Sequence, residues 1–385
     1  MRIILLVIGL VGIGGLILMN TPYNAQNNIE DCPKPNIPYS DFWLLTDFCS
    51  TTVPMDEIIS GGPPPDGIPP IDNPRFESIE SASVWLQPQS PVLVFEHNGI
   101  ARAYPLAMMT RHEIVNDEID GLPIAVTYCP LCNSGIIFER RINDVTLRLG
   151  VSGLLRNSDM VMWDDVTQTW WQQFTGEGIV GEFAGVSLPM LFSAMVGFGV
   201  FAEQYPEGKV LTRESGYGTN RYGSNPYYGY DSTTQPFLFL GTPDSRLPAT
   251  ERVLAGVIGG EPIAYPFTVL STAKVINDAV GDKQVVAFWQ PGATSALDDS
   301  NIDESRNVGM AMLFNARLDD VTYTFRYESG QIRDDQTNST WSVFGTAIDG
   351  ELVGSQLRQE LAAPHFWFAW AAFKPDTRIY ELLQP

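Results

Sequence analysis

Apolar and polar residues alternate in several short stretches of the chain, which is the pattern of half-buried strands. The stretch VLVFEHNGIARAY, from Val92, has apolar residues on both sides of Asn98-Gly99, a pair typical of type I′ turns, and predicts a hairpin. LPIAVTY, residues 122–128, predicts a buried strand, and residues 135–150 predict a second hairpin that turns near Asn143. We therefore expect an α+β fold dominated by antiparallel sheet.

Three other stretches predict helices. PLAMMTRHEIV, from Pro105, predicts a short helix, because proline suits the first helical turn. PMLFSAMVGFGVFAEQYP, from Pro189, predicts a helix that ends before Pro206. FWFAWAAF, which follows His365, predicts an aromatic helix.

The chain repeats itself. The segment from Val92 to Pro130 aligns without a gap to the segment from Val253 to Pro291, at a constant offset of 161 residues. The identical positions are, in the first copy, Val92, Leu93, Gly99, Ala103, Tyr104, Pro105, Asn116, Asp117 and Pro130. We therefore predict two fused copies of one module, the first module at residues 75–212 and the second module at residues 236–385.

Two segments adjoin the modules. Residues 27–74 contain the run GGPPPDGIPPIDNP, which should be extended and polyproline-like. Residues 213–235 connect the modules and place several tyrosines among glycines, including Tyr217 and Tyr222. This connector is either a flexible linker or a loop that lays aromatic rings over a site.

Charge and the N-terminus bear on where the protein works. With 23 basic and 45 acidic residues, the net charge is −22, which excludes nucleic acid as a partner because phosphates need basic surface. Arg2 precedes an uncharged, mostly apolar run at residues 3–18. Residues 1–26 are therefore expected to be a signal peptide or an N-terminal membrane anchor. Either places the body of the protein outside the cytoplasm, in the periplasm, at the cell surface or secreted.

Cys32 and Cys49 flank a short loop near the N-terminus. Disulfides persist outside the cytoplasm, so we expect these two residues to form a structural disulfide. Closing this loop should stabilise the fold by about 3 kcal/mol.

Cys129 and Cys132 form a Cys-x-x-Cys pair in VTYCPLCNSG. The repeat provides a control, because framework residues recur in the second module whereas soft and titratable residues do not. Met108, Met109, His112, Cys129 and Cys132 become Val269, Leu270, Ala273, Gln290 and Ala293. This contrast favours a functional site in the first module, with the second module as its scaffold.

The expected ligands of that site are Cys129, Cys132, His112 and Met108. Met108 and His112 share a helix face, and the following strand should return to bring Cys129 beside His112. Met109 and His365 are alternative ligands. Thiolates with imidazole and thioether suit copper better than zinc. A redox-active dithiol, with a thiol pKa lowered by imidazolium, and an inert disulfide stay open as alternatives.

Polar residues also lie among aromatic ones in GLLRNSDMVMWDDVTQTWW. Asn157 and Asp159 are candidates to line the site. Asp164 and Asp165 have the residue types of a general acid and base. However, DDQTNSTW repeats both acids in the second module, which indicates a structural turn.

The segments RHEIVNDEIDGLPIAVTYCPLC, GVSGLLRNSDMVMWD and HFWFAWAAFKPDT resemble the DUF3179 family of exported prokaryotic proteins. The resemblance covers most of residues 75–385. The family's His-Glu-Ile-Val-Asn-Asp and Tyr-Cys-Pro-Leu-Cys segments fall on residues 112–117 and 128–132, while Arg111 and Arg156 depart from its pattern. The resemblance implies a domain of unknown function and no particular reaction.

Together these features predict an exported or membrane-anchored copper-binding protein for electron transfer or metal handling. Its partner would be a redox protein or a metal donor. The alternatives are a thiol-disulfide redox enzyme that uses Cys129 and Cys132, and a structural surface module.

Overall fold

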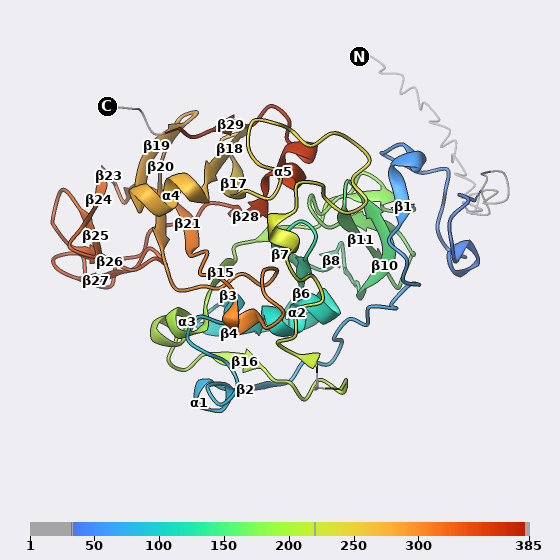
Figure 1. The fold of residues 1–385 in the computed structure, drawn as a ribbon, viewed down its shortest axis with the longest axis horizontal. Coiled ribbons are helices and arrows are strands. Elements are labelled where there is room, and N and C mark those ends of the chain that lie inside the picture. Colours follow the sequence, from blue (N-terminus) through green and yellow to red (C-terminus); the bar gives the residue numbers. More distant parts are fainter. Residues whose placement is uncertain (1–31, 33, 219–220, 382–385) are drawn as a thin grey trace, which may run out of the picture.

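A computed structural model describes residue 32, residues 34–218 and residues 221–381 (Figure 1). The predicted signal peptide or anchor, residues 1–26, lies outside this part of the chain. In the described residues, no helix is both long and apolar enough to cross a membrane.

Antiparallel sheets dominate the first module, as predicted. One sheet has the order β15-β3-β4-β16-β2, a second β14-β7-β6-β5, and a third, which includes a strand from the preceding segment, β1-β10-β11-β12-β13. The strands are β1 Ile58–Ser60, β2 Phe76–Ser78, β3 Pro91–His97, β4 Ile100–Pro105, β5 Ile114–Ile119, β6 Leu122–Cys129, β7 Ser134–Glu139, β8 Arg141–Ile142, β9 Val145–Thr146, β10 Leu149–Arg156, β11 Asp159–Asp164, β12 Trp170–Gln172, β13 Gly178–Val180, β14 Met190–Leu191, β15 Ala194–Gly197 and β16 Lys209–Leu211.

The second module has corresponding sheets. Their orders are β28-β17-β18-β29, β19-β20-β21 and β24-β25-β26-β27. The strands are β17 Arg252–Ile258, β18 Glu261–Pro266, β19 Val275–Val280, β20 Lys283–Gln290, β21 Met310–Asn315, β22 Arg317–Leu318, β23 Val321–Thr322, β24 Phe325–Glu328, β25 Gln331–Asp334, β26 Thr340–Trp341, β27 Ala347–Asp349, β28 Ala362–Phe366 and β29 Arg378–Ile379.

The helices are short. The α-helices are α1 Ile79–Ala82, α2 Leu106–His112, α3 Phe198–Gln204, α4 Phe267–Ala273 and α5 Trp367–Phe373, and the 3-10 helices are η2 Ser40–Phe42, η3 Met55–Glu57, η5 Tyr230–Ser232 and η6 Ile302–Glu304. Two predictions need correction here. The helix from Pro105 ends at His112, because Glu113 takes a left-handed conformation with φ 58° and starts the chain into β5. Residues 189–197 form β14 and β15, and only the end of that stretch is helical, as α3.

The predicted hairpin at Asn98-Gly99 is confirmed. Strands β3 and β4 pair from Val92↔Pro105 to His97↔Ile100, and both turn residues have positive φ, 52° and 81°. Strands β17 and β18 pair in the same register 161 residues later, from Val253↔Pro266. The Tyr104 hydroxyl donates to Asp117 (2.6 Å), and the Tyr265 hydroxyl donates to Asp278 (2.9 Å). Both modules therefore use the same strand pairing and the same tyrosine–aspartate bond.

The two modules share a core. One buried cluster contains Val126 and Ile137 of the first module together with Val253 and Phe366 of the second. Strand β28 lies against β7, where the Phe366 N–H donates to the carbonyl oxygen of Cys132 (2.9 Å). In Figure 1, β28 and the start of α5 accordingly lie close to β7. The second module thus covers the end of the first module that carries the cysteines.

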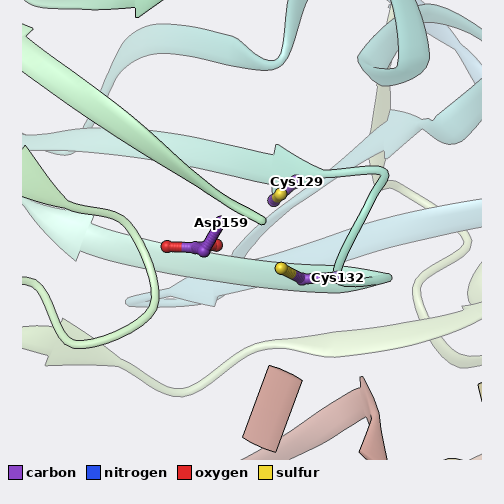
Figure 2. Close-up of side chains that lie close together, drawn as sticks. All are labelled: Cys129, Cys132 and Asp159. Atoms are coloured by element: carbon purple, nitrogen blue, oxygen red, sulfur yellow. The ribbon is translucent and has the colours of Figure 1, made fainter. Parts of the chain in front are cut away.

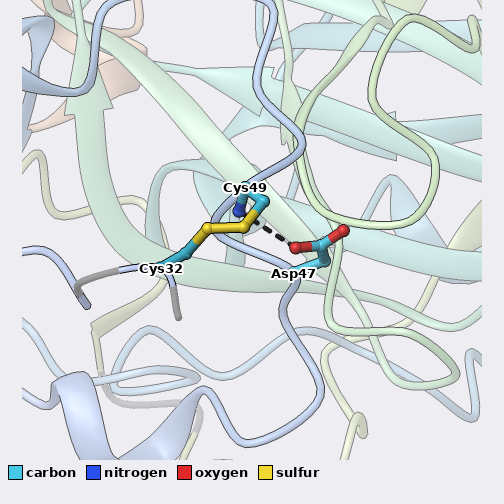
Figure 3. The surroundings of a disulfide bond; sticks show 3 residues. All are labelled: Cys32, Asp47 and Cys49. Atoms are coloured by element: carbon cyan, nitrogen blue, oxygen red, sulfur yellow. Dashed lines mark hydrogen bonds between the residues drawn. A yellow bond between two sulfur atoms is a disulfide. The ribbon is translucent and has the colours of Figure 1, made fainter. Parts of the chain in front are cut away.

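The N-terminal segment is attached to the first module. Cys32 and Cys49 form the predicted disulfide, with their Cα atoms 5.5 Å apart (Figure 3). Trp43 is buried against Trp163 and Trp170. The proline-rich run is also fixed to the fold, because the Gly61 N–H donates to the carbonyl oxygen of Gly153 (2.8 Å) and residue 71 bridges to β5.

Candidate functional site

Cys129 and Cys132 lie at the turn between β6 and β7. Cys129 ends β6, and the turn closes through the Asn133 N–H, which donates to the carbonyl oxygen of Pro130 (3.1 Å). Asn133 has φ 47°, a left-handed conformation that asparagine tolerates. Both cysteines are buried, and they are not joined by a disulfide. The turn therefore presents two free thiols inside the protein.

The tip of the β10–β11 hairpin meets this turn. Asn157 and Ser158 form its two-residue loop, with φ 54° and 64°, the conformation of a type I′ turn. Through this loop the Ser158 carbonyl oxygen approaches the Sγ atoms of Cys129 (3.9 Å) and Cys132 (3.7 Å). Asp159, the first residue of β11, follows directly and points toward both thiols (Figure 2).

Cys129, Cys132 and Asp159 form a compact group. One carboxylate oxygen and the two Sγ atoms all lie within 4.8 Å of one another, and all three residues are buried. Oδ2 of Asp159 accepts from Gln172 (2.6 Å) and from the Phe174 N–H (2.9 Å). Oδ1 is buried and has no hydrogen-bond partner among the described residues. Since buried polar atoms are almost always paired, this oxygen is available to accept a thiol proton or to bind a ligand.

Burial sets the protonation of the group. It raises the pKa of the Asp159 carboxyl to about 6, although the bonds from Gln172 and Phe174 oppose this. Burial also raises the pKa of Cys129 and raises that of Cys132 well above its usual value, the latter with the help of the neighbouring Cys129. Three ionised groups at this distance would need a cation. The group therefore either holds its protons or exchanges them for a metal ion.

Glu113 is a further buried acid near the group. Its backbone carbonyl accepts from the Tyr128 N–H (2.8 Å), which places it beside the end of β6. Its Oε1 accepts from the hydroxyl of Tyr227 in the connector (3.2 Å), and burial raises its pKa to about 7. Glu113 was not among the site residues predicted from the sequence. The repeat held a signal, because Lys274 occupies the corresponding position of the second module.

The structure does not place His112 with the cysteines. Its Nδ1 lies 2.7 Å from the Pro69 carbonyl oxygen, its Nε2 lies 2.7 Å from the Tyr222 hydroxyl, and it is not part of the compact group. Because a carbonyl can only accept, Nδ1 carries the proton and Nε2 accepts from Tyr222. Strand β6 does return beside α2, as expected, but the His112 ring is held by Pro69 and Tyr222 and not by the cysteines at the end of that strand.

The other predicted residues lie around the group in different roles. Met108 and Met109 are fully buried in the core. His365 reaches the neighbourhood from β28, with Nδ1 3.0 Å from Ser134 Oγ, and burial lowers its pKa to about 3. The Tyr217 ring lies 4.8 Å from that of His112. The connector therefore places aromatic rings on the first module. This agrees with its interpretation as a loop that lays aromatic rings over a site, and not with that of a flexible linker.

Asp164 belongs to the turn after β11 and not to the site. Its carboxylate accepts from Thr167, from Thr169 and from Trp171 Nε1 (2.9 Å). Asp334 makes the same set of bonds with Thr337, Ser339 and Trp341 in the second module. The structural interpretation of these acids is confirmed.

Comparison with known proteins identifies the family. Residues 65–377, most of the 385-residue chain, match the family model described as "Protein of unknown function (DUF3179)". No curated protein and no solved structure matches the chain. The match spans the cysteine turn, the β10–β11 hairpin and both modules, and it confirms the resemblance seen in the sequence. The chain belongs to the DUF3179 family.

Proposed function

We propose that the protein binds one soft metal ion through Cys129, Cys132 and Asp159. The observation that carries this proposal is Oδ1 of Asp159, which is buried without a hydrogen-bond partner in the described part of the chain and lies in a compact group with two buried thiols. A metal ion would satisfy this oxygen and would compensate the charge of deprotonated ligands. The role that we propose for the ion is electron transfer or metal handling.

Copper and zinc are the ions that suit these donors. Two thiolates alone satisfy copper in its +1 state, whereas zinc accepts thiolate sulfur together with a carboxylate oxygen. The earlier preference for copper depended on His112 and Met108 as ligands. With Asp159 in the group, a divalent ion gains support, because it offsets more of the negative charge. We therefore propose copper or zinc.

Metal analysis tests this proposal. Protein produced in its extracytoplasmic compartment, with copper and zinc supplied, should carry about one ion per chain by mass spectrometry. Cys129→Ser with Cys132→Ser, and separately Asp159→Asn, should remove the ion while unfolding stays cooperative. Gln290→Ser, at the position that corresponds to Cys129, is the matched control and should keep it. A metal-free protein with a quantitative Cys129–Cys132 disulfide would refute metal binding.

A redox-active dithiol is the second candidate. Asp159 favours it, because a carboxyl with a pKa of about 6 beside two thiols can accept a thiol proton. Protein substrates would not reach cysteines that are 1% and 0% exposed, so the oxidant would be a small disulfide. Reversible formation of the Cys129–Cys132 bond by such a compound, in protein that binds no metal, would support this candidate.

Two wider proposals accompany the metal site. We propose that the protein is exported, and the Cys32–Cys49 disulfide and the apolar run at residues 3–18 support this. We also propose that the modules arose by internal duplication. The common register of β3–β4 and β17–β18 and the recurring aspartate turn support that origin.

A further inference from the structure

A cavity of about 640 Å³ lies beside the proposed metal site. Its wall combines the β10–β11 hairpin, the proline-rich run and the connector, and one residue of the cysteine turn, Leu131, takes part. Four aromatic rings line it, from Tyr227, Tyr228, Tyr230 and Phe237. Mostly apolar walls of this kind are typical of sites for small molecules.

The wall of this cavity carries one acidic side chain and no basic one. Glu113 is the acid in the wall, and its lining contains no lysine, arginine or histidine. Glu113 is only 6% exposed, and none of the ion pairs in the described part of the chain includes it. Among the residues that the structure describes, the Tyr227 hydroxyl is the one group that donates a hydrogen bond to its side chain. A buried carboxylate without a cation is costly, so this wall would repel an anionic ligand and attract a positive one.

The second module shows that the fold does not require an acid at this position. Lys274 ends α4 as Glu113 ends α2, with φ 64° against 58°. The Lys274 ammonium lies 3.8 Å from the centre of the Trp289 ring, so the second module supplies its own cation to an aromatic face. In the first module the corresponding helix end carries a carboxylate beside aromatic rings. The Glu113 carboxyl, whose pKa burial raises to about 7, therefore either holds its proton or pairs with a cation supplied by a ligand.

We propose that this cavity binds a small organic cation, a quaternary ammonium or a protonated amine, with Glu113 as its counter-ion and the tyrosine rings around its positive end. Aromatic faces and a carboxylate together recognise such cations, and desolvation strengthens both interactions. The site is distinct from the metal group, and its occupancy does not depend on a metal ion.

Binding of choline tests this inference. Choline and 3,3-dimethylbutan-1-ol have nearly the same shape, but only choline is charged. Titration calorimetry of the full chain should show saturable choline binding at least about tenfold tighter than that of the alcohol, the scale of a desolvated cation–aromatic contact. Glu113→Gln should weaken choline binding about tenfold and leave the alcohol unchanged, because the amide oxygen can still accept from Tyr227.

Lys274→Gln is the matched control and should bind choline as the wild type does. If Glu113→Gln proves unstable in thermal unfolding, Tyr227→Phe serves as the second variant. It keeps the ring and removes the hydroxyl, so it should retain most of the choline binding. Equal affinity for choline and the alcohol, absence of saturable binding, or normal choline binding by Glu113→Gln would each overturn the inference.

Discussion

At the scale of single residues, the site is defined by groups whose ionised forms are suppressed. Asp159 and Glu113 lie in one buried neighbourhood, and burial raises the pKa of both. Each carboxyl therefore keeps its proton in the folded protein at pH values where the unfolded chain has lost it. Such perturbed acids are characteristic of functional sites.

The pH dependence of stability should reveal Asp159. Its pKa is about 6 in the folded chain against an ordinary 3.8, so the folded state binds more protons between these values. Stability of the metal-free protein should therefore fall as the pH rises from 4 to 6, by about 3 kcal/mol from this residue. Urea unfolding after chelation should show a smaller fall for Asp159→Asn. Equal slopes for wild type and variant would contradict the raised pKa.

His112 should prove to be a structural residue. Its ring joins Pro69 to Tyr222 through two hydrogen bonds. His112→Phe keeps the ring but loses both bonds, so it should lower the free energy of unfolding by about 2 kcal/mol. Its metal content should equal that of the wild type. Loss of the metal from a folded His112→Phe protein would restore His112 as a ligand and reject the group with Asp159.

At the scale of elements, the length of one hairpin separates the two modules. Strand β11 has 6 residues, whereas its counterpart β25 has 4. Both strands end at an aspartate with the same hydrogen bonds, Asp164 or Asp334, so the extra residues lengthen the hairpin toward its tip. That extension carries Ser158 and Asp159 to the cysteines, and the shorter second hairpin provides no equivalent.

Elements with local sequence signals were predictable, whereas elements fixed by tertiary contacts were not. The β3–β4 hairpin was predictable because Asn98-Gly99 specifies its turn. Residues 189–197 were not, because a short apolar run fits a buried strand as well as a helix, and pairing with β3 decides between them. Asp159 could be proposed as site-lining, but its place beside Cys129 depends on how two sheets pack. His112 was misplaced because Pro69 and Tyr222, which are distant in the sequence, hold its ring, and no local pattern specifies those contacts.

Replacing Asn277 or its counterpart Asn116 tests whether a residue supports only the fold or also the metal site. Asn277 donates to the Phe325 carbonyl oxygen (2.7 Å) and accepts from the Phe325 N–H (2.8 Å), and Asn116 holds Leu149 in the same way (2.8 and 3.0 Å). Asn277→Ala should cost about 2 kcal/mol in chemical unfolding, because two hydrogen bonds are lost, and should keep the metal.

Asn116→Ala should cost a similar amount and also weaken metal binding, because Leu149 begins the strand that leads to Asp159. Metal titration of both variants separates these outcomes. Loss of the metal from Asn277→Ala with an intact fold would mean that the site depends on both modules directly.

At the scale of the whole molecule, the second module acts on the site through the interface. Strand β28 lies along β7 and bonds to Cys132, and in return β15 of the first module contacts β21 of the second. The buried cluster that surrounds the cysteines includes residues of both modules. We therefore expect the modules to unfold together, since two large buried clusters each contain residues of both modules.

Gly197 provides the sharpest test of this interface. It ends β15 and precedes α3 with an ordinary φ of −73°, so alanine suits its backbone, but a Cβ there would overlap the carbonyl oxygen of Gly292 in the second module. Gly197→Ala should lower stability by about 1–3 kcal/mol, the cost of overpacking, and weaken metal binding as β28 shifts on β7. Gly218→Ala is the matched control, because its added Cβ would meet no atom within 4 Å among the described residues and its φ is not left-handed. Thermal unfolding measures the stability of each variant, and metal titration measures its metal binding. If Gly197→Ala matches Gly218→Ala in both measurements, the contact between Gly197 and Gly292 does not hold the modules together. The second module then has no structural influence on the site through this contact.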